Sequence, residues 1–213
     1  MAALESQHFL DNSRKRVNPM RLVILDRDGV INRDSDAYIK SAEEWEALPG
    51  SLEAIARLCR AHFRVVIASN QSGLGRGLFN STALNRIHDK MHRELRHHGG
   101  ALDAIFLCPH TPEEDCGCRK PAPGLFAEIA GRLKCSLSDV PAVGDSLRDL
   151  EAAEAGGAKP IYVLSGKNPF RLRPDETLPA ESGWAETPLF ENLSCFVDAL
   201  LDGKLNAYLG RSE

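Results

Sequence analysis

The sequence predicts an α/β fold of three layers, a Rossmann-like sandwich with helices on both faces of a central parallel sheet. Short apolar runs alternate with segments of helical periodicity from residue 21 to residue 165. Strands that alternate with helices pair in parallel, because each connection crosses over one face of the sheet. Polar residues follow three of the predicted strands, at the edge of such a sheet where ligands bind.

The first half of the chain alternates between strand and helix. Residues 21–25 (RLVIL) and 64–68 (RVVIA) are apolar runs typical of buried strands, and residues 51–63 between them have helical spacing. A second helix should have Ser81 as its N-cap and should end at Gly99. Its apolar face is predicted from four residues at helical spacing: Leu84, Ile87, Met91 and Leu95.

The second half continues the alternation. We expect three strands and two helices, at residues 103–107, 140–143 and 160–164 and at residues 123–133 and 147–156. Residues 166–187 are rich in proline, glycine and charge and should form a loop. Residues 188–201 are compatible with a last strand and helix.

Length and charge limit the kind of protein. The chain has 213 residues, 43% of them apolar, which is enough for one domain with a buried core. We expect residues 1–19 to be a flexible extension and residues 20–213 to be that single domain. The net charge of −4 provides no general basic field, so we expect neither nucleic acid nor a membrane as a partner.

Cellular location and cysteine usage are linked. No run of 18 apolar residues occurs, and the first twenty residues lack the apolar core of a signal peptide, so we expect a cytoplasmic protein, and a monomer. Because the cytoplasm keeps thiols reduced, six cysteines need an explanation other than disulfides. Cys59, Cys135 and Cys195 are isolated and should be small packing residues.

Two carboxylates follow the first predicted strand, in Asp26-Arg27-Asp28-Gly29. Two carboxylates at a strand end should share one cation. A carboxylate can attack phosphorus as a nucleophile, and a second carboxyl nearby can protonate the leaving oxygen. Aspartate and glycine are also common in turns, so this motif alone leaves a simple turn as an alternative.

Further polar groups follow two other predicted strands. Residues 69–73 (SNQSG) offer hydroxyls and amides, and we expect Gly73, Gly75 and Gly77 to keep that loop open for an anion. Asp145 follows a later strand, with Asp149 one helical turn beyond, although helix capping is an alternative for both. With Lys120 as a cation, these groups are what Mg²⁺-dependent phosphoryl transfer requires.

A cysteine and histidine cluster precedes that lysine. Cys108, His110, Cys116 and Cys118 provide three thiolates and an imidazole, a set suited to tetrahedral Zn²⁺. Four protein ligands leave no position for water, so we expect a structural rather than a hydrolytic site. A redox pair of two cysteines is the alternative, but it would leave the other two ligands unexplained.

The loop that carries this cluster cannot anchor itself by burial. Residues 109–121 contain almost no aliphatic side chain, so a zinc ion would replace the missing core. Fixing Cys118 also fixes the start of the pair Arg119 and Lys120. We therefore expect a zinc-stapled loop whose purpose is to place these two cations.

The order DRDG, SNQSG, RKP and GDSLRD resembles the four motifs of the haloacid dehalogenase superfamily of phosphatases, across about residues 21–165. The resemblance implies Asp26 as the nucleophile and Asp28 as the general acid and then the base. It implies that Ser69 and Lys120 stabilise the phosphoryl group. The implied Mg²⁺ ligands are the Asp26 and Asp145 carboxylates and the Asp28 main-chain carbonyl, supported by Asp149; the remaining candidates for substrate contacts near the second motif are Asn70, Gln71 and Ser72.

Within that superfamily, two bacterial families share the CPH…CxCRKP loop, the D-glycero-D-manno-heptose 1,7-bisphosphate phosphatases and the histidinol-phosphate phosphatases. The stretches NQSGLGRGLF and RKPAPGLF resemble the heptose family, and we expect no dehydratase domain of the kind often fused to the histidinol enzyme. The resemblance implies hydrolysis of the 7-phosphate, in the synthesis of nucleotide-activated heptose for lipopolysaccharide core or a surface glycan. Histidinol phosphate or another small sugar phosphate is the alternative substrate, and the preferred anomer stays open.

The same resemblance implies how a second phosphate is recognised. Arg119 is the expected contact outside the reacting phosphate. Residues 34–39 resemble the family's DxGYV substrate loop, with one extra residue and Ala37 in place of glycine, and they nominate Asp34 and Tyr38 as contacts.

No large cap domain fits between the second motif and the next strand, so we expect an open site. Five other cations are expected to be solvated surface groups: Arg76, Arg148, Lys167, Arg171 and Arg173.

Two other classes of protein fit the sequence less well. A zinc-knuckle nucleic-acid module predicts a basic stripe with interleaved aromatic residues. A pI near 6.0 and an aromatic content of 6% argue against it. A catalytically inactive binding protein is disfavoured because every motif residue is present.

Overall fold

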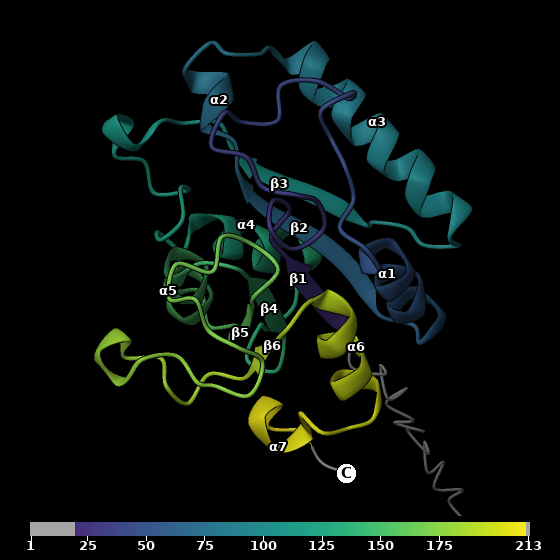
Figure 1. Cartoon of the computed structure of the whole chain (residues 1–213), viewed down its shortest axis with the longest axis vertical. Coiled ribbons are helices and arrows are strands. Elements are labelled where there is room, and N and C mark those ends of the chain that lie inside the picture. The colour runs from purple at the N-terminus through teal and green to yellow at the C-terminus, as the bar shows by residue number, and fades with distance from the viewer. Residues whose placement is uncertain (1–19, 212–213) are drawn as a thin grey trace, which may run out of the picture.

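The computed structural model describes residues 20–211 and contains one six-stranded parallel sheet between two sets of helices (Figure 1). The strand order is β3-β2-β1-β4-β5-β6. The strands are β1 (Leu22–Leu25), β2 (Arg64–Asn70), β3 (Ala104–Cys108), β4 (Pro141–Gly144), β5 (Lys159–Val163) and β6 (Leu189–Phe190). The predicted three-layer α/β class is therefore confirmed; the prediction for residues 1–19 lies outside the described residues.

The helices alternate with the strands along the chain. They are α1 (Ser51–Arg60), α2 (Ser72–Gly75), α3 (Ser81–His97), α4 (Gly124–Leu133), α5 (Leu147–Ala155), α6 (Leu193–Leu201) and α7 (Asn206–Leu209), with single 3₁₀ turns at Pro112–Glu114 and Ala180–Ser182. Neither α2 nor α7 was predicted, because a helix of four residues is too short to show a periodic pattern. No helix among residues 20–211 is long and apolar enough to cross a membrane.

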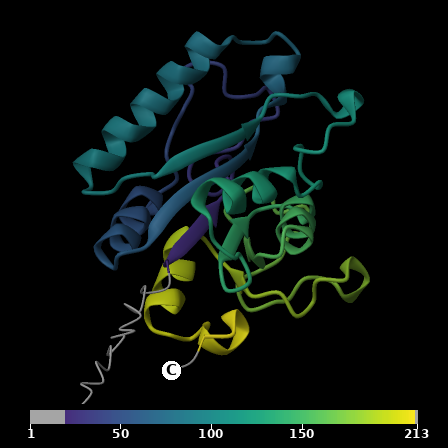
Figure 2. The same cartoon turned by 180° about the vertical axis from the view of Figure 1, so that it is seen from behind.

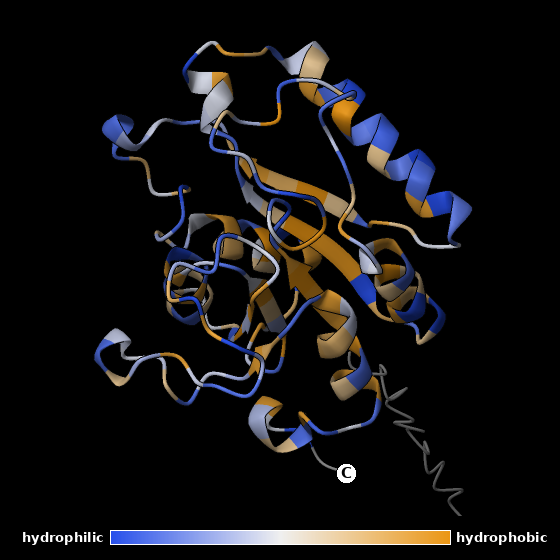
Figure 3. Cartoon of the chain, in the orientation of Figure 1, coloured by the Kyte–Doolittle hydropathy of each residue, from blue (hydrophilic) through white to orange (hydrophobic). Residues whose placement is uncertain are grey.

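Alternate residues of each strand face opposite layers of helices. Leu22 and Ile24 pack with α4 and α5, whereas Val23 and Leu25 pack with α1, α3 and α6. Figures 1 and 2 show these two sets of helices on opposite sides of the sheet. Figure 3 shows apolar residues along the central strands and hydrophilic residues along most of α3. Each fully buried leucine or isoleucine stabilises the fold by about 1.5–3 kcal/mol.

The register of the central strands brings three functional segments to one edge. Leu25, the last residue of β1, pairs with Ile67 of β2 and with Val143 of β4. The main-chain N–H of Asp26 continues this ladder, donating to the Val143 carbonyl at 2.8 Å. The residues that follow β1, β2 and β4 therefore emerge side by side.

The start of α3 differs from the prediction. Asn80, not Ser81, is the N-cap, since the Asn80 Oδ1 accepts from the Ala83 N–H at 2.9 Å. Ser81 is the first helical residue. Both residue types are good caps, and asparagine is among the most favoured, so the cap moved by one position.

The glycines after β2 do not keep a loop open, so that expectation was wrong for two of them. Gly73 and Gly75 lie in α2, and their lack of a side chain permits close packing. A Cβ at Gly73 would lie 2.3 Å from the Phe79 ring, and one at Gly75 would lie 2.8 Å from the Pro109 carbonyl. The connection from β2 to β3 contains only α2 and α3 as regular elements, which agrees with the expected absence of a large cap.

Candidate active site

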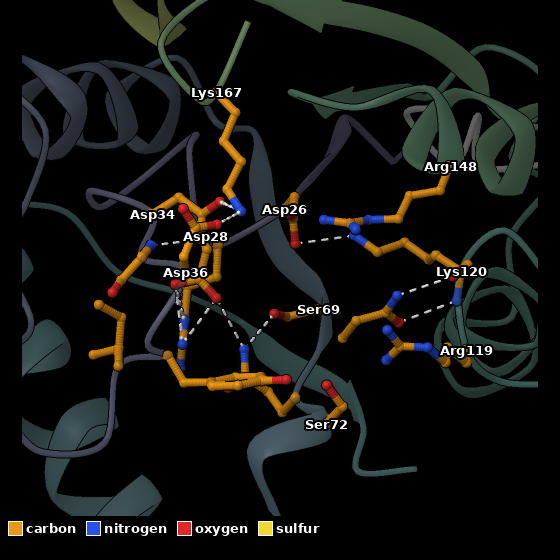
Figure 4. A pocket seen from close by; sticks show the side chains of 16 residues that line it. Asp26, Asp28, Asp34, Asp36, Ser69, Ser72, Arg119, Lys120, Arg148 and Lys167 are labelled. Atoms are coloured by element: carbon orange, nitrogen blue, oxygen red, sulfur yellow. Dashed lines mark hydrogen bonds and ion pairs between the residues drawn. The ribbon is translucent and has the colours of Figure 1, made fainter. Parts of the chain in front are cut away.

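A pocket of about 310 Å³ opens at the carboxyl edge of the sheet (Figure 4). Its walls come from the ends of β1 and β2, the cysteine-rich loop, the start of α5 and the loop after β5. The lining residues are Asp26, Arg27, Asp28, Asp34, Ser35, Asp36, Tyr38, Ile39, Ser69, Asn70, Gln71, Ser72, Arg119, Lys120, Arg148 and Lys167. The structure thus brings together every residue proposed from sequence for substrate contact or catalysis.

A buried lysine occupies the centre of this site. Lys120 is 3% exposed, and its Nζ lies 2.9 Å from the Asp26 Oδ1 and 2.6 Å from the Asp149 Oδ1. It also donates to the Ala68 carbonyl at 2.8 Å. Burial acts to lower the pKa of Lys120, but the two carboxylates outweigh it and raise this pKa, so the side chain is an ammonium.

All three N–H donors of that ammonium are engaged by protein oxygens. The lysine therefore acts on an incoming anion chiefly through its charge. Its main chain is also fixed, because the Asn70 side chain donates to the Lys120 carbonyl and accepts from the Lys120 N–H, both at 3.0 Å. The Asn70 amide thus holds the Lys120 main chain in position.

Three carboxylates cluster below the pocket. Asp26, Asp145 and Asp149 each offer an oxygen, and these oxygens lie within 4.8 Å of one another. Burial raises the pKa of Asp26 to about 6, against the opposing effect of Lys120. Although burial acts to raise the pKa of Asp149, Lys120 and Ser146 lower it.

Of the three carboxylates, Asp26 and Asp149 pair with Lys120, whereas Asp145 forms no ion pair within residues 20–211. Burial raises its pKa to about 8, and the negative charges of Asp149 and Asp26 add to that effect. The backbone crowds around it, since a Cβ at Gly29 or at Gly166 would lie 2.3 Å or 1.8 Å from the Asp145 Oδ2. A divalent cation with a preference for oxygen ligands fits this set, because it would relieve the repulsion between Asp145 and Asp26.

The second carboxylate of the first motif has different surroundings. The Asp28 carboxylate accepts hydrogen bonds from the Arg27 Nε and Nη2 at 3.0–3.1 Å and from the Asn32 amide at 2.8 Å. The Gln71 amide links it to the second motif, donating to the Asp28 Oδ2 at 3.2 Å and to the Ser69 Oγ at 2.8 Å. Since the Ser69 oxygen accepts this bond, its own hydroxyl hydrogen remains available to an anion in the pocket.

The cysteine and histidine ligands come together as a compact group. One atom from each of Cys108, His110, Cys116 and Cys118 lies within 4.8 Å of the others. The Cys118 Sγ is 3.1 Å from the Cys108 Sγ and 3.3 Å from the His110 Nδ1. Cys108 is the last residue of β3, so the loop is attached to the sheet at this point. Three sulfurs and one imidazole nitrogen fit a tetrahedral Zn²⁺.

The residue 34–39 loop forms the wall opposite Lys120. Asp34 and Tyr38 both line the pocket, and Tyr38 has a positive φ of 62°. Lys167, from the loop after β5, contacts Asp34 at 3.3 Å and also pairs with Asp36 (Figure 4). This pair of contacts ties two pocket walls together.

Two of the cations expected to be solvated surface groups are exposed and also lie on the pocket wall, a position that the sequence did not predict. Arg148 and Lys167 line the pocket, whereas Arg76 pairs with Glu113 and Arg173 with Glu176 at the surface. Arg148 follows β4 and Lys167 follows β5. Their positions just after parallel strands could have indicated the shared edge.

The raised pKa of Asp145 predicts a specific pH dependence of stability. The ordinary pKa is 3.8 and the folded value about 8. Between these values the folded state holds one more proton than the unfolded state, so this carboxyl destabilises the fold as pH rises. Without added divalent cation, Asp145→Asn should therefore gain stability over the parent from about pH 4 to about pH 8, reaching on the order of 1–3 kcal/mol.

Urea unfolding across this pH range measures the difference. Asp175→Asn is the control, because Asp175 is an exposed loop residue that pairs with Arg173 at 3.8 Å. It should track the parent at every pH. A gain for Asp145→Asn that does not change with pH would contradict the assignment.

Comparisons with known proteins agree with this geometry. Residues 117–182 match a HAD-hydrolase-like family model, and residues 21–147 match the polynucleotide kinase 3 phosphatase model. A Bordetella bronchiseptica protein named D-glycero-beta-D-manno-heptose-1,7-bisphosphate 7-phosphatase is 54% identical over 183 residues, which are 85% of this chain and 98% of the relative. A Mycobacterium tuberculosis protein named as the alpha-anomer enzyme is 39% identical over 150 residues, or 66% of this chain and 78% of that protein.

A solved structure gives the same result. The D,D-heptose 1,7-bisphosphate phosphatase of B. bronchiseptica, in complex with magnesium and phosphate, superposes with a TM-score of 0.80 at 54% identity, covering 86% of this chain and 99% of the other. Fold, motif geometry and similarity over nearly the whole relative thus agree. The chain belongs to the haloacid dehalogenase superfamily and, within it, to the D-glycero-D-manno-heptose 1,7-bisphosphate phosphatase family.

Proposed function

We propose that the protein hydrolyses the 7-phosphate of D-glycero-D-manno-heptose 1,7-bisphosphate, as a step toward nucleotide-activated heptose. The observation that carries the proposal is the buried Asp26 carboxylate, held by Lys120 at the base of a pocket with cations on its walls. The relative at 54% identity is named for the beta anomer and the one at 39% for the alpha anomer, so we expect the beta anomer to be preferred.

The first half-reaction uses both aspartates of the first motif. The Asp26 carboxylate attacks phosphorus and forms an aspartyl-phosphate while the bond from phosphorus to the sugar oxygen breaks. Asp28 gives its proton to that leaving oxygen. Since the pKa of Asp26 is raised only to about 6, the nucleophile is ionised at neutral pH.

The second half-reaction releases phosphate. A water molecule attacks the phosphorus of the aspartyl-phosphate, and Asp28, now a carboxylate, takes the proton of that water. The Asp26 carboxylate is regenerated and inorganic phosphate leaves. Lys120 stabilises the charge on the phosphoryl oxygens throughout, and the Ser69 hydroxyl donates a hydrogen bond to one of them.

The carboxylate cluster supports a role for Mg²⁺. Asp26 and Asp145, with the main-chain carbonyl of Asp28, would hold the ion, and it would neutralise negative charge on the transferring phosphoryl group. Asp149 has less to offer as a ligand, because Lys120 and the Ser146 N–H and hydroxyl already occupy its oxygens. We assign Asp149 to orienting Lys120.

The cluster of three cysteines and His110 supports a structural Zn²⁺ in the loop before Arg119. That ion would fix the loop at one end while Asn70 fixes Lys120 at the other. The thiols require a reducing environment, which supports the cytoplasm as the location.

A substrate panel tests the proposed activity. With Mg²⁺, phosphate release should be fastest from the heptose bisphosphate, beta before alpha, and slower from fructose 1,6-bisphosphate and histidinol phosphate. Asp26→Asn should lose activity by at least roughly 10³-fold, because the covalent step is removed. Circular dichroism and zinc content establish that the variant is folded. Dominant turnover of histidinol phosphate would contradict the substrate, and parental activity of Asp26→Asn would contradict the mechanism.

Removal of zinc should lower activity by disordering the loop. Cys116→Ser should lose bound zinc and most of its kcat/KM, because the loop that places Arg119 and Lys120 loses one of its two attachments while the sheet stays intact. Metal analysis, circular dichroism and phosphate release give the three readouts. Cys135→Ser is the matched control, since Cys135 is a partly buried cysteine outside the cluster. Full activity in a zinc-free Cys116→Ser protein would contradict a placing role.

Arg119→Ala should reduce the preference for a bisphosphate over a monophosphate. Arg119 lines the pocket and makes one long contact, 3.3 Å from its Nη1 to the His110 carbonyl, so most of its donors face ligand or solvent. Loss of a charge-assisted contact should lower the ratio of the two kcat/KM values about tenfold or more. Arg173→Ala, which removes a surface pair with Glu176, should leave the ratio unchanged.

A further inference from the structure

The arginine inside the first motif is buried, although no step of the proposed reaction uses it. Arg27 is 1% exposed, and its Nη1 has no hydrogen-bond partner within residues 20–211. Burying a guanidinium nitrogen without a partner costs free energy, and an apolar side chain would avoid that cost. Packing alone therefore does not account for an arginine here. Its other two nitrogens both contact Asp28.

The donors around Asp28 are distributed unequally between its two oxygens. The Oδ1 accepts from the Arg27 Nε at 3.1 Å, from its Nη2 at 3.0 Å and from the Asn32 amide at 2.8 Å. The Oδ2 shares the same Nη2 at 3.0 Å and has only the Gln71 amide at 3.2 Å in addition. That amide is closer to the Ser69 oxygen, at 2.8 Å, so its contact with Asp28 is the weaker one.

This asymmetry matches the two oxygens of a carboxylic acid. The carbonyl oxygen accepts hydrogen bonds, and the hydroxyl oxygen donates its proton. With its lone pairs taken by fixed donors, the Oδ1 is suited to be the carbonyl oxygen. The Oδ2 lies on the side of Gln71 and Ser69, where the phosphoryl group would be bound (Figure 4).

We propose that Arg27, assisted by Asn32, is a positioning residue that holds the Asp28 Oδ1 and so selects the Oδ2 as the oxygen that exchanges the proton. The proposal rests on the general acid role of Asp28 proposed above. In the first half-reaction the proton passes from the Oδ2 to the leaving sugar oxygen. In the second it returns to the Oδ2 from the attacking water. Arg27 keeps its protons and acts through Asp28, since its Nε contacts only the Oδ1 and its Nη2 is shared between the Oδ1 and the Oδ2.

A second feature favours positioning over simple packing. The Arg27 carbonyl accepts from the Ile31 N–H at 2.8 Å and from the Asn32 N–H at 3.1 Å, closing the turn that follows the motif. The turn is thus held by main-chain bonds that do not need the Arg27 side chain. Replacing that side chain should leave the turn in place while releasing the Asp28 carboxyl to rotate.

Leaving-group dependence provides the test. A series of aryl phosphates, from phenyl phosphate to p-nitrophenyl phosphate, keeps the phosphoryl group and ring while the leaving phenol becomes more acidic. The phenolate of a more acidic phenol leaves more readily without being protonated. Loss of proton donation therefore slows phenyl phosphate more than p-nitrophenyl phosphate. The ratio of the two kcat/KM values does not depend on the fraction of folded enzyme. It therefore stays informative even if a variant is less stable.

Asp28→Asn sets the benchmark, and its loss should be about 10²-fold greater for phenyl phosphate than for p-nitrophenyl phosphate. Arg27→Gln should change the ratio in the same direction by about tenfold or more, and Arg27→Lys should recover part of it by keeping one charged donor. Ser51→Ala is the control, because it removes a buried hydrogen bond to the Ile31 carbonyl without contacting Asp28. It should leave the ratio at the parental value.

The outcomes separate the two levels of the proposal. A parental ratio for Arg27→Gln, together with a changed ratio for Asp28→Asn, overturns the positioning role and leaves the proposed reaction intact. A parental ratio for Asp28→Asn overturns the general acid itself and the inference with it. A ratio changed equally by Ser51→Ala and Arg27→Gln shows that the change does not require a lost contact with Asp28, and it also overturns the inference.

Discussion

The buried ammonium of Lys120 is the constraint on which the rest of the site depends. It joins three parts of the chain, since its partners are Asp26 after β1, the Ala68 carbonyl within β2 and Asp149 in the first turn of α5. A buried charge that loses its partner costs about 3–5 kcal/mol. The carboxyl edge of the sheet and the loop that supplies Lys120 must therefore be correct together.

This requirement explains why several residues around Lys120 serve to hold it in position. The Asn70 side chain forms two hydrogen bonds with the Lys120 main chain, and the cysteine and histidine cluster ends at Cys118, just before Lys120 in the sequence. Although the loop has almost no aliphatic residues, Cys116 and Cys118 pack against the core that contains Cys108, and Asn70 holds the main chain of Lys120. Within residues 20–211 the same commitment leaves Asp145 without a cation in contact, so burial and the negative charges of Asp149 and Asp26 raise its pKa, and a divalent ion suits the position.

The fold and the composition of the site could be predicted, but their details could not. Periodicity gave the strands and the long helices, and residues after parallel strands gave the shared edge. A single turn such as α2 has no repeat to detect, and the choice between Asn80 and Ser81 as cap depends on local backbone angles. The pocket positions of Arg148 and Lys167 were not predicted, because an exposed cation after a strand gives the same sequence signal whether or not it borders a pocket.

The hydrogen-bond donors of the pocket fall into two groups, those already bonded within the protein and those free to contact a ligand. Lys120 has no side-chain donor left, and Asn70 uses its oxygen and one of its two N–H donors on the Lys120 main chain, so these two residues define geometry and charge at the floor. Among residues 20–211, Arg148 forms no side-chain ion pair within 4.0 Å, although it lines the same wall. Cations that are not consumed by the fold can turn toward a ligand at little cost in lost contacts. A substrate with two separated phosphates can therefore place one phosphate at the rigid floor near Lys120. Its second phosphate can contact cations of the pocket wall whose side chains are free to reorient.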